Sequence, residues 1–313
     1  QNVAVGGYAL ANDTTGGNSA VGYKALTTNT TGDYVTAMGY NALELNTTGS
    51  SNSAFGYKSL EDNTTASNNT AVGYIALNTN TTGAENTAVG ANALTSNSTG
   101  EENVAIGYKA LEANTTASGN TAVGRKSMLT NTTGASNSAF GVDSLYDNTT
   151  GDYNTAVGRA ALANNTTADA NTAVGYYALL TSTTASNNTA VGASSAALTT
   201  TGAQNTALGA RALYTNTTTN NNTAVGYDAL YTNTASNNTA VGRDSSKANT
   251  TGTLLVSVGA WSLAANTTGI RNTAIGYESM SANTTGSHNT AVGTYALATP
   301  TGANHNTAVG YYA

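Results

Sequence analysis

The stretch NTAVGYYAL, residues 171–179, is the key to the fold, because near copies of it recur along the whole chain. Close variants are NTAVGRAAL at 154–162, NTALGARAL at 205–213 and NTAVGYDAL at 222–230. The glycine of each copy, here called the ruler glycine, occurs nineteen times between Gly6 and Gly310. Successive ruler glycines are spaced by seventeen positions, except for two steps of sixteen. Such a sustained period is the signature of a repeat architecture.

The repeat length and its local patterns predict a parallel β-solenoid, or β-roll, with one coil per seventeen-residue repeat. Helix-pair repeats need roughly 30 or more residues, so the period is too short for them. The phrase TAVGY alternates and is rich in β-branched residues, which favours a strand. NTTG favours a turn. We expect two short strands and two turns per coil.

The repeat fills the chain, so we expect residues 1–313 to form one continuous array of about 18 coils. Neighbouring strands lie roughly 4.8 Å apart, which predicts a rod about 85–90 Å long. The chain begins and ends in the middle of a repeat. We therefore expect it to be a segment of a longer fibre.

Stacking turns each repeat position into a row of like residues along the solenoid. The residue before the ruler glycine is always apolar, and the residue four after it is mostly Leu. Both rows are expected to face into the coil as its core. The predicted core ladder includes Val89, Ile106, Val123, Phe140, Val157 and Val174 before the glycine, and Leu94, Leu111, Leu145 and Leu162 after it.

Two asparagines recur in each repeat, one before the strand and one in the NTTG turn. Stacked side-chain amides can hydrogen-bond to the coils above and below, as in other cross-β assemblies. We interpret both rows as structural. The predicted ladder before the strand includes Asn86, Asn103, Asn120, Asn137, Asn154 and Asn171, and only Val35 and Leu255 depart from it.

Each coil offers little apolar core, about one Val, one Leu and some Ala. Burying so few apolar groups does not offset the backbone entropy that is lost when a whole repeat becomes ordered. Hydrogen bonds must supply much of the difference, and a second chain can contribute too. The invariant small residues also indicate backbones in close contact. A homotrimer of parallel coils is therefore favoured over a monomeric solenoid.

The sequences NVAIG at 103–107 and NVAVG at 2–6 resemble the head repeat of trimeric autotransporter adhesins, the YadA-like head. The resemblance implies a left-handed, trimeric parallel β-roll that is exposed on a bacterial surface and used for adhesion. That family has a shorter repeat than the one found here. The longer pattern GYxALxxNTTGxxNTAVGY resembles repeats of phage tail fibres and of large bacterial surface proteins.

Composition excludes several classes of function. Charged residues make up only 8% of the chain, and the ten Lys and Arg form no basic stripe, which argues against nucleic-acid binding. There is no cysteine, so disulfides and thiolate metal sites are excluded. No apolar run approaches the length of a membrane-spanning helix, and no targeting sequence begins the chain.

A catalytic site should break the repeat, so departures from the template are the places to search. His288 and His305 occupy the same repeat position, as do the pairs Glu85 with Glu102 and Asp152 with Asp169. We interpret all six as exposed loop residues. The least regular stretch, residues 243–263, contains the only Trp and is either a contact site, a kink or a tolerated variation. We predict no enzyme, metal site or cofactor.

Nine of the 18 tyrosines directly follow a ruler glycine, in a place that Arg takes in three other coils. A position that accepts Arg is expected to be wet, so this row is a candidate contact surface, with stacking between coils as the alternative. The NTT turn is also an N-glycosylation motif, although turn chemistry alone explains it. The predicted contact residues are Tyr23, Tyr40, Tyr57, Tyr74 and Tyr108.

The favoured function is a structural and adhesive module of an extracellular fibre: the rigid rod of a surface filament, adhesin head or tail fibre, on a cell or virion surface. Its expected partners are further copies of itself and host-surface or matrix glycans or proteins, bound through many weak contacts.

The alternative is an ice-binding β-solenoid, because flat solenoids with regular Thr ranks order water. The strand Thr argues against this alternative, because Val replaces it three times and Ser three times. It should also point inward if the neighbouring Val does. A polysaccharide-cleaving fibre is a third hypothesis, which the small coils disfavour.

Overall fold

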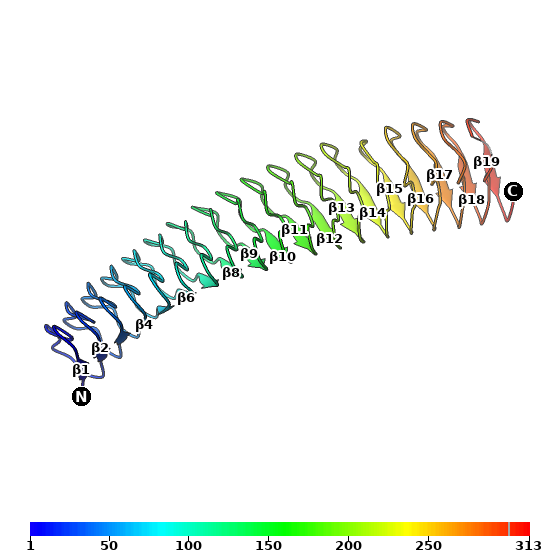
Figure 1. Ribbon diagram of the computed structural model, residues 1–313. Coiled ribbons are helices and arrows are strands. Elements are labelled where there is room, and N and C mark those ends of the chain that lie inside the picture. The colour runs from blue at the N-terminus through cyan, green and yellow to red at the C-terminus, as the bar shows by residue number, and fades with distance from the viewer. Residues whose placement is uncertain (300) are drawn as a thin grey trace. The chain divides into compact units, whose positions relative to one another are not determined.

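The computed structural model describes residues 1–299 and 301–313. It is all-β: the described residues contain nineteen parallel strands of three residues each, and no helix. The chain divides into two compact units, residues 1–154 and 155–313. Each unit is a parallel β-solenoid with one coil per repeat, about 18 coils in all. Figure 1 shows the strands of each unit side by side, joined by turns. The predicted all-β parallel β-solenoid with seventeen-residue coils is confirmed.

In the first unit each strand pairs in register with the strand one repeat later, so that Ala88, for example, lies opposite Ala105. The strands are β1 Val3–Val5, β2 Ser19–Val21, β3 Thr36–Met38, β4 Ser53–Phe55, β5 Thr70–Val72, β6 Thr87–Val89, β7 Val104–Ile106, β8 Thr121–Val123 and β9 Ser138–Phe140.

The second unit repeats this arrangement, and the shorter step within it leaves the register intact. Thr223 pairs with Thr239 across a sixteen-residue step, because the missing residue is lost from the turn. There Asn233 Nδ2 donates to the Ala235 carbonyl oxygen, two residues on, at 2.6 Å. The strands are β10 Thr155–Val157, β11 Thr172–Val174, β12 Thr189–Val191, β13 Thr206–Leu208, β14 Thr223–Val225, β15 Thr239–Val241, β16 Val256–Val258, β17 Thr273–Ile275, β18 Thr290–Val292 and β19 Thr307–Val309.

Each coil holds one strand rather than the two expected. After the ruler glycine the backbone enters the left-handed region at alternate residues, as at Asn92 (φ 56°) and Leu94 (φ 51°). A β-strand cannot contain such residues. The segment still bonds to the next coil, since the Leu94 amide donates to the Ala110 carbonyl oxygen at 2.9 Å. The second side of the coil is therefore a hydrogen-bonded run of turns.

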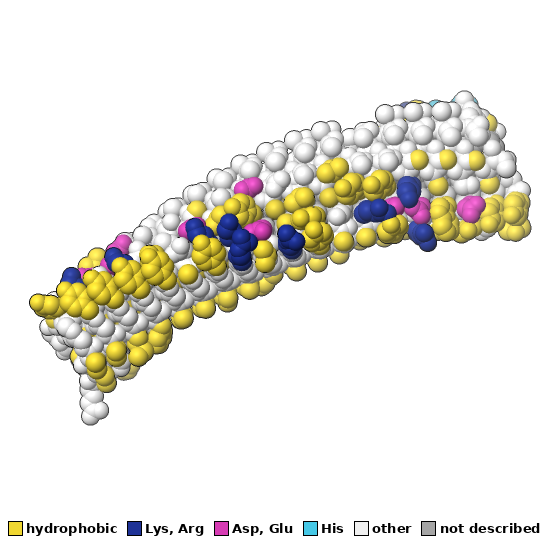
Figure 2. Space-filling model, in the orientation of Figure 1, with side chains coloured by type: hydrophobic (Ala, Val, Ile, Leu, Met, Phe, Trp, Pro, Cys, Tyr) yellow, Lys and Arg dark blue, Asp and Glu magenta, His cyan; other side chains and the backbone are white. Residues whose placement is uncertain are grey.

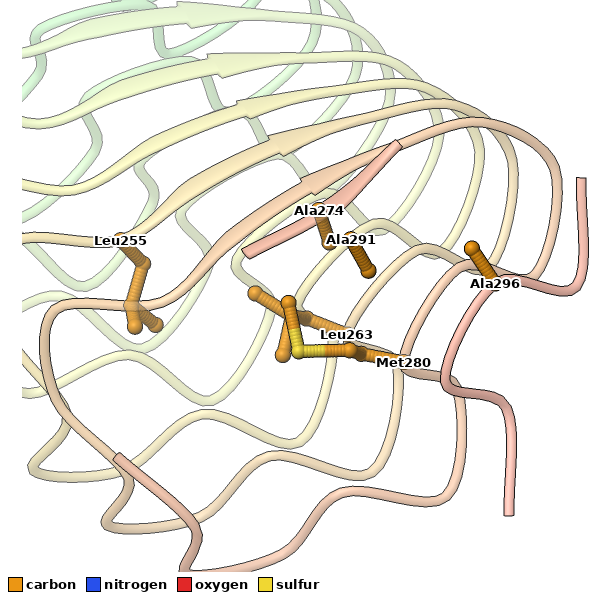
Figure 3. Close-up of a cluster of buried hydrophobic side chains, with 6 residues drawn as sticks. All are labelled: Leu255, Leu263, Ala274, Met280, Ala291 and Ala296. Carbon is orange, nitrogen blue, oxygen red and sulfur yellow. The ribbon is translucent and has the colours of Figure 1, made fainter. Parts of the chain in front are cut away.

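The interior of the coil contains Leu and Ala. The predicted inward positions Leu94, Leu111, Leu145 and Leu162 are fully buried, as expected. Facing them is the central Ala of each strand, which is also fully buried in most coils. Figure 3 shows this packing in the second unit, where the strand residues Ala274 and Ala291 point toward Leu263 and Met280 of the opposite segment. Leu255, just before a strand, and Ala296, in the turn segment, complete the buried cluster.

The prediction that the residue before the ruler glycine also faces inward is wrong. In a strand, successive side chains point to opposite faces, so an inward Ala requires outward neighbours. The interior opposite the strand accepts only the methyl group of Ala. The six residues named for this row are half-buried or exposed on the outer surface: Val89, Ile106, Val123, Phe140, Val157 and Val174.

The ruler glycine is required by close contact between coils. Gly90 has φ +136°, and a Cβ built on it would lie 2.5 Å from the Gly107 carbonyl oxygen. Real Cβ atoms do not approach backbone atoms this closely, and side chains other than that of Gly are strained at this φ. This explains why the position is glycine in all nineteen repeats.

We predict that Gly90→Ala destabilises the protein by about 3 kcal/mol or more, because it combines backbone strain with a clash between coils. Chemical denaturation followed by circular dichroism measures the change. Gly7→Ala is the matched control, because a Cβ on Gly7 would meet no atom closer than 3.5 Å and Ala91 holds the same repeat position. The control should cost under about 1 kcal/mol. Equal losses in the two variants would contradict this explanation.

Candidate interaction surface

The asparagine before each strand forms a buried ladder, here called the strand-start ladder. The Asn103 amide donates to Asn86 Oδ1 at 3.0 Å, and Asn103 Oδ1 accepts from the Asn120 amide at 3.0 Å. Asn103 Nδ2 donates to the Ala117 carbonyl oxygen at 2.8 Å. The side chain thus joins three successive coils. The predicted members are all fully buried: Asn86, Asn103, Asn120, Asn137, Asn154 and Asn171.

The turn asparagine forms a second buried ladder, here called the turn ladder. Asn97 Nδ2 donates to Asn80 Oδ1 and to the Gly100 carbonyl oxygen, each at 2.9 Å. Asn97 Oδ1 accepts from Asn114 Nδ2 at 2.8 Å. The Gly100 carbonyl also accepts from Asn86 Nδ2 at 2.8 Å, so the two ladders meet at one oxygen. Bonding between stacked amides, as predicted, occurs in this second ladder.

The least regular stretch contains a buried hydroxyl network. Ser246 stands where Leu is usual, and Ser257 replaces the strand Ala one coil on. Their hydroxyl groups are 2.8 Å apart, and Ser245 Oγ also lies 2.8 Å from Ser257 Oγ. The two substitutions therefore compensate each other inside the coil. Outside it, the Arg243 guanidinium lies 5.3 Å from the Trp261 ring centroid.

The first and third residues of all strands form an outward surface, here called the strand face. Its first row is Thr in most coils, with Ser or Val in the others, and its third row is Val, Ile, Leu, Met or Phe. The third row is considerably exposed, by 40% at Ile106 and 42% at Phe140. No charged residue occurs in either row. The strand face is thus a continuous uncharged surface within each unit.

Tyr23, Tyr40, Tyr57 and Tyr74 form a stacked row, here called the tyrosine row. Adjacent ring centroids are 5.3, 5.4 and 5.3 Å apart, with interplanar angles of 21°, 12° and 10°. The four side chains are 42–53% exposed. Tyr108 is exposed as well, but Ala91 separates it from the stack. Since stacking occupies the ring faces, the row offers ring edges and hydroxyl groups to a partner.

Charged side chains beside the tyrosine row pair with one another. Lys24 Nζ lies 2.8 Å from Glu44 Oε1, and Lys58 Nζ lies 2.9 Å from Glu61 Oε1. The hydrogen bond to Glu44 raises the pKa of Lys24. Burial by itself raises the pKa of Glu61. Hydrogen bonds from Asn41 and other side chains have a larger combined effect, so the net pKa of Glu61 is lowered. Figure 2 shows that within each unit the charged side chains on the face in view lie next to apolar ones.

A second ionic cluster lies in the second unit around the buried carboxylate of Asp228. Arg211 Nη2 and Lys247 Nζ approach Asp228 Oδ2 to 2.8 and 2.9 Å, and Lys247 also reaches Asp244 Oδ1 at 2.9 Å. The Arg211 guanidinium lies 4.8 Å from the Tyr227 ring centroid and donates to its hydroxyl. The cations thus pair with Oδ2 of Asp228, whereas its buried Oδ1 has no hydrogen-bond partner among the described residues.

The predicted loop residues lie on the surface. The His288 and His305 rings stack 4.9 Å apart, and Arg271 Nη1 is 3.2 Å from His288 Nε2. Glu85 and Glu102 are exposed. Asp152 accepts from the Ala135 amide at 2.7 Å, and the Asp169 amide donates to Ser186 Oγ at 3.0 Å. Across residues 1–299 and 301–313, no three His, Asp or Glu side chains are grouped to hold a metal ion.

In the part of the chain that the structure describes, no helix has the length and apolar character needed to cross a bilayer. No family model matches the chain. No curated protein matches it either.

We predict that Asn120→Leu lowers the free energy of unfolding by about 1–3 kcal/mol, because it leaves the buried Asn137 amide unpaired and the Gly134 carbonyl oxygen with only the Asn131 donor. It removes the acceptor of the Asn137 amide and one donor to the Gly134 carbonyl oxygen. Leu255 stands at the same repeat position and is almost fully buried, so leucine fits there. Thermal and denaturant unfolding measure the loss.

Thr121→Val is the control for that variant. It changes the neighbouring residue, the first of its strand, to Val, which already stands at that strand position in Val104 and Val256. It should change stability by less than about 0.5 kcal/mol. If Asn120→Leu were as stable as this control, the ladder would not stabilise the coil.

Proposed function

We propose that the chain is a structural and adhesive module of an extracellular fibre, as in a surface filament, adhesin head or tail fibre, and not an enzyme. The observation that carries the proposal is the strand face, which presents an apolar residue in every coil and no charge. Soluble monomers rarely expose contiguous apolar surface beyond a few hundred Å². Such a surface is suited to burial against other chains.

The proposed assembly is a homotrimer of parallel chains that pack their strand faces together. Depletion of charge is characteristic of the cores of protein interfaces. The strand face meets this condition along each unit, whereas Lys24, Glu44 and the other charged groups described above lie outside it. Burying its Val, Ile and Phe side chains would add the apolar burial that the narrow coil interior lacks. The resemblance of NVAIG to trimeric adhesin heads supports three chains of left-handed coil.

The proposed adhesive surface is the tyrosine row, which would remain exposed when strand faces pack together. Its hydroxyl groups and ring edges recur once per coil from Tyr23 to Tyr74. Regular weak contacts of this kind add through multivalency when the partner is itself repetitive. Glycans and matrix or host-surface proteins are partners of this type.

Sedimentation velocity and native mass spectrometry test the assembly. We expect the native chain to be a trimer and the double variant Ile106→Glu/Phe140→Glu to dissociate, with association weakened by about 100-fold or more because unpaired charges are buried. Glu85→Lys places a charge change on an exposed residue outside the strand face and should remain trimeric. A monomeric native chain, or equal effects of the two variants, would refute association through this face.

Ice binding is a second candidate, because the strand Thr points outward beside the apolar row and not inward as expected. Thr172 and Thr189 pair in register and are half-exposed, as in a regular Thr rank. This function requires the strand face to be free, whereas the trimer buries it. If the chain binds ice, it should show thermal hysteresis that Thr172→Lys/Thr189→Lys abolishes. No hysteresis at high protein concentration eliminates this candidate.

A further inference from the structure

The chain contains nineteen N-x-S/T motifs, and thirteen of them begin at the turn asparagine. In these the acceptor nitrogen is inside the coil. Asn80 Nδ2, for example, donates both of its protons, to Asn63 Oδ1 at 3.0 Å and to the Gly83 carbonyl oxygen at 2.8 Å. All thirteen side chains are at least 98% buried: Asn29, Asn46, Asn63, Asn80, Asn97, Asn114, Asn131, Asn148, Asn165, Asn216, Asn249, Asn266 and Asn283.

Four further motifs have the form N-N-T with the second Asn in the strand-start ladder, and they differ from the turn motifs in which side chain points outward. In residues 68–70 the first Asn is exposed, the second is buried in the strand-start ladder, and the Thr lies on the strand face. Asn68 has φ 64°, a left-handed conformation that Asn tolerates better than most residues. Its Nδ2 makes no hydrogen bond within residues 1–154. The four exposed acceptors are Asn68, Asn187, Asn221 and Asn237.

The acceptor motif also requires a Ser or Thr hydroxyl group two residues after the Asn. In these four motifs that hydroxyl group is not engaged in a hydrogen bond within the described part of the protein. Thr70, Thr189, Thr223 and Thr239 are half-exposed, and none of their hydroxyl groups has a hydrogen-bond partner among the described residues. The two remaining motifs differ in this respect. Asn12 and Asn164 are exposed, but Thr14 Oγ1 donates to the Thr30 carbonyl oxygen at 2.6 Å and Thr166 Oγ1 to that of Thr183 at 3.0 Å.

We propose that Asn68, Asn187, Asn221 and Asn237 are acceptor sites for N-linked glycosylation of the folded protein. The donor is a diphosphate-activated sugar, either a nucleoside diphosphate sugar or a lipid diphosphate oligosaccharide. The Asn Nδ2 bonds to the anomeric carbon, the bond from that carbon to the diphosphate oxygen breaks, and the diphosphate leaves with the electron pair. The amide loses one proton to the transferase base, and no group is oxidised or reduced.

The buried turn asparagines are excluded as acceptors of the folded chain for two physical reasons. Transfer to Asn80 would remove one of its two donated protons and break a hydrogen bond of the turn ladder. The sugar would also have to occupy the interior of the coil, where Leu and Ala already pack. Because the Thr of each motif lies on the strand face, the transferase must reach the folded chain before strand faces pack together in the proposed fibre.

The test uses the folded full chain and a protease digest of the same chain as substrates, each as the native sequence and as the Ile106→Glu/Phe140→Glu variant, whose strand faces stay apart and accessible. One arm supplies a soluble N-glycosyltransferase with a nucleoside diphosphate hexose, and the other an oligosaccharyltransferase with a lipid diphosphate oligosaccharide, each first shown to be active on the digest. Glycopeptide mass spectrometry then maps the sites. In the folded chain we expect sugar at Asn68, Asn187, Asn221 and Asn237 in at least one arm, with the turn asparagines modified only in the digest.

The arm that modifies the folded chain identifies the donor class. Modification of the turn asparagines in the folded chain at the rate of Asn68, or no modification of the four exposed sites in either arm, overturns the proposal. Thr70→Val should reduce sugar at Asn68 at least tenfold and leave Asn187 unchanged. The fold should tolerate this variant, because Val104 and Val256 stand at the same position.

A matched pair of gain variants gives the sharpest control. Glu85 and Glu102 occupy the repeat position of Asn68 and are both exposed. Glu85→Asn creates an N-N-T motif that ends at Thr87, whereas Glu102→Asn creates none because residue 104 is Val. We expect new glycosylation at position 85 and none at position 102. Equal modification of the two variants, or none in either, contradicts the proposed geometry.

Discussion

The structure depends on the contact between each ruler glycine and the backbone of the next coil. A Cβ on Gly209 would lie 2.6 Å from the Gly226 carbonyl oxygen, and the same holds in the first unit between Gly90 and Gly107. At the positive φ of the ruler glycine a Cβ would point along the stack at the next backbone, about 4.8 Å away, so no side chain fits there. The strand, the turns after it and both asparagine ladders keep their register only if this contact is made in every coil.

A coil of only seventeen residues encloses a small interior, and much of that interior is polar. One Leu and two small residues per coil are packed with two fully buried Asn side chains, as at Leu94, Asn86 and Asn97. Buried amides are tolerated because almost all their groups are hydrogen-bonded to neighbouring coils. The Leu itself has a positive φ, which is costly for a bulky residue and persists because backbone hydrogen bonds to the next coil hold it. Cohesion along each unit therefore comes largely from hydrogen bonding.

On the outer surface, some repeat positions hold the same type of residue in every coil, whereas others vary from coil to coil. The strand face repeats Thr or its substitutes and an apolar residue in every coil, which suits an interface between identical chains. The position before the strand-start Asn varies instead, and includes Glu85, Tyr153, Arg271 and His288 in the same left-handed conformation. Each coil can thus differ at this edge without disturbing its neighbours. The proposed glycan sites belong to this variable edge, and the strand face lies between it and the tyrosine row.

The sequence by itself determined the period, the parallel solenoid, the buried Leu row and the asparagine ladders, because spacing along the chain sets which residues stack. It did not determine which strand side faces inward: alternation defines two faces, and the backbone path after the ruler glycine decides which one meets the interior. Ile106 and Phe140 are outside for this reason. The direction in which the turns point their side chains decides two further features. It brings the hydroxyl groups of Ser246 and Ser257 together, and it buries Asn80 but exposes Asn68. Only the tertiary structure specifies the direction in which each of these side chains points. Residues with a left-handed backbone conformation change the direction of the chain, and the sequence pattern does not mark where they occur.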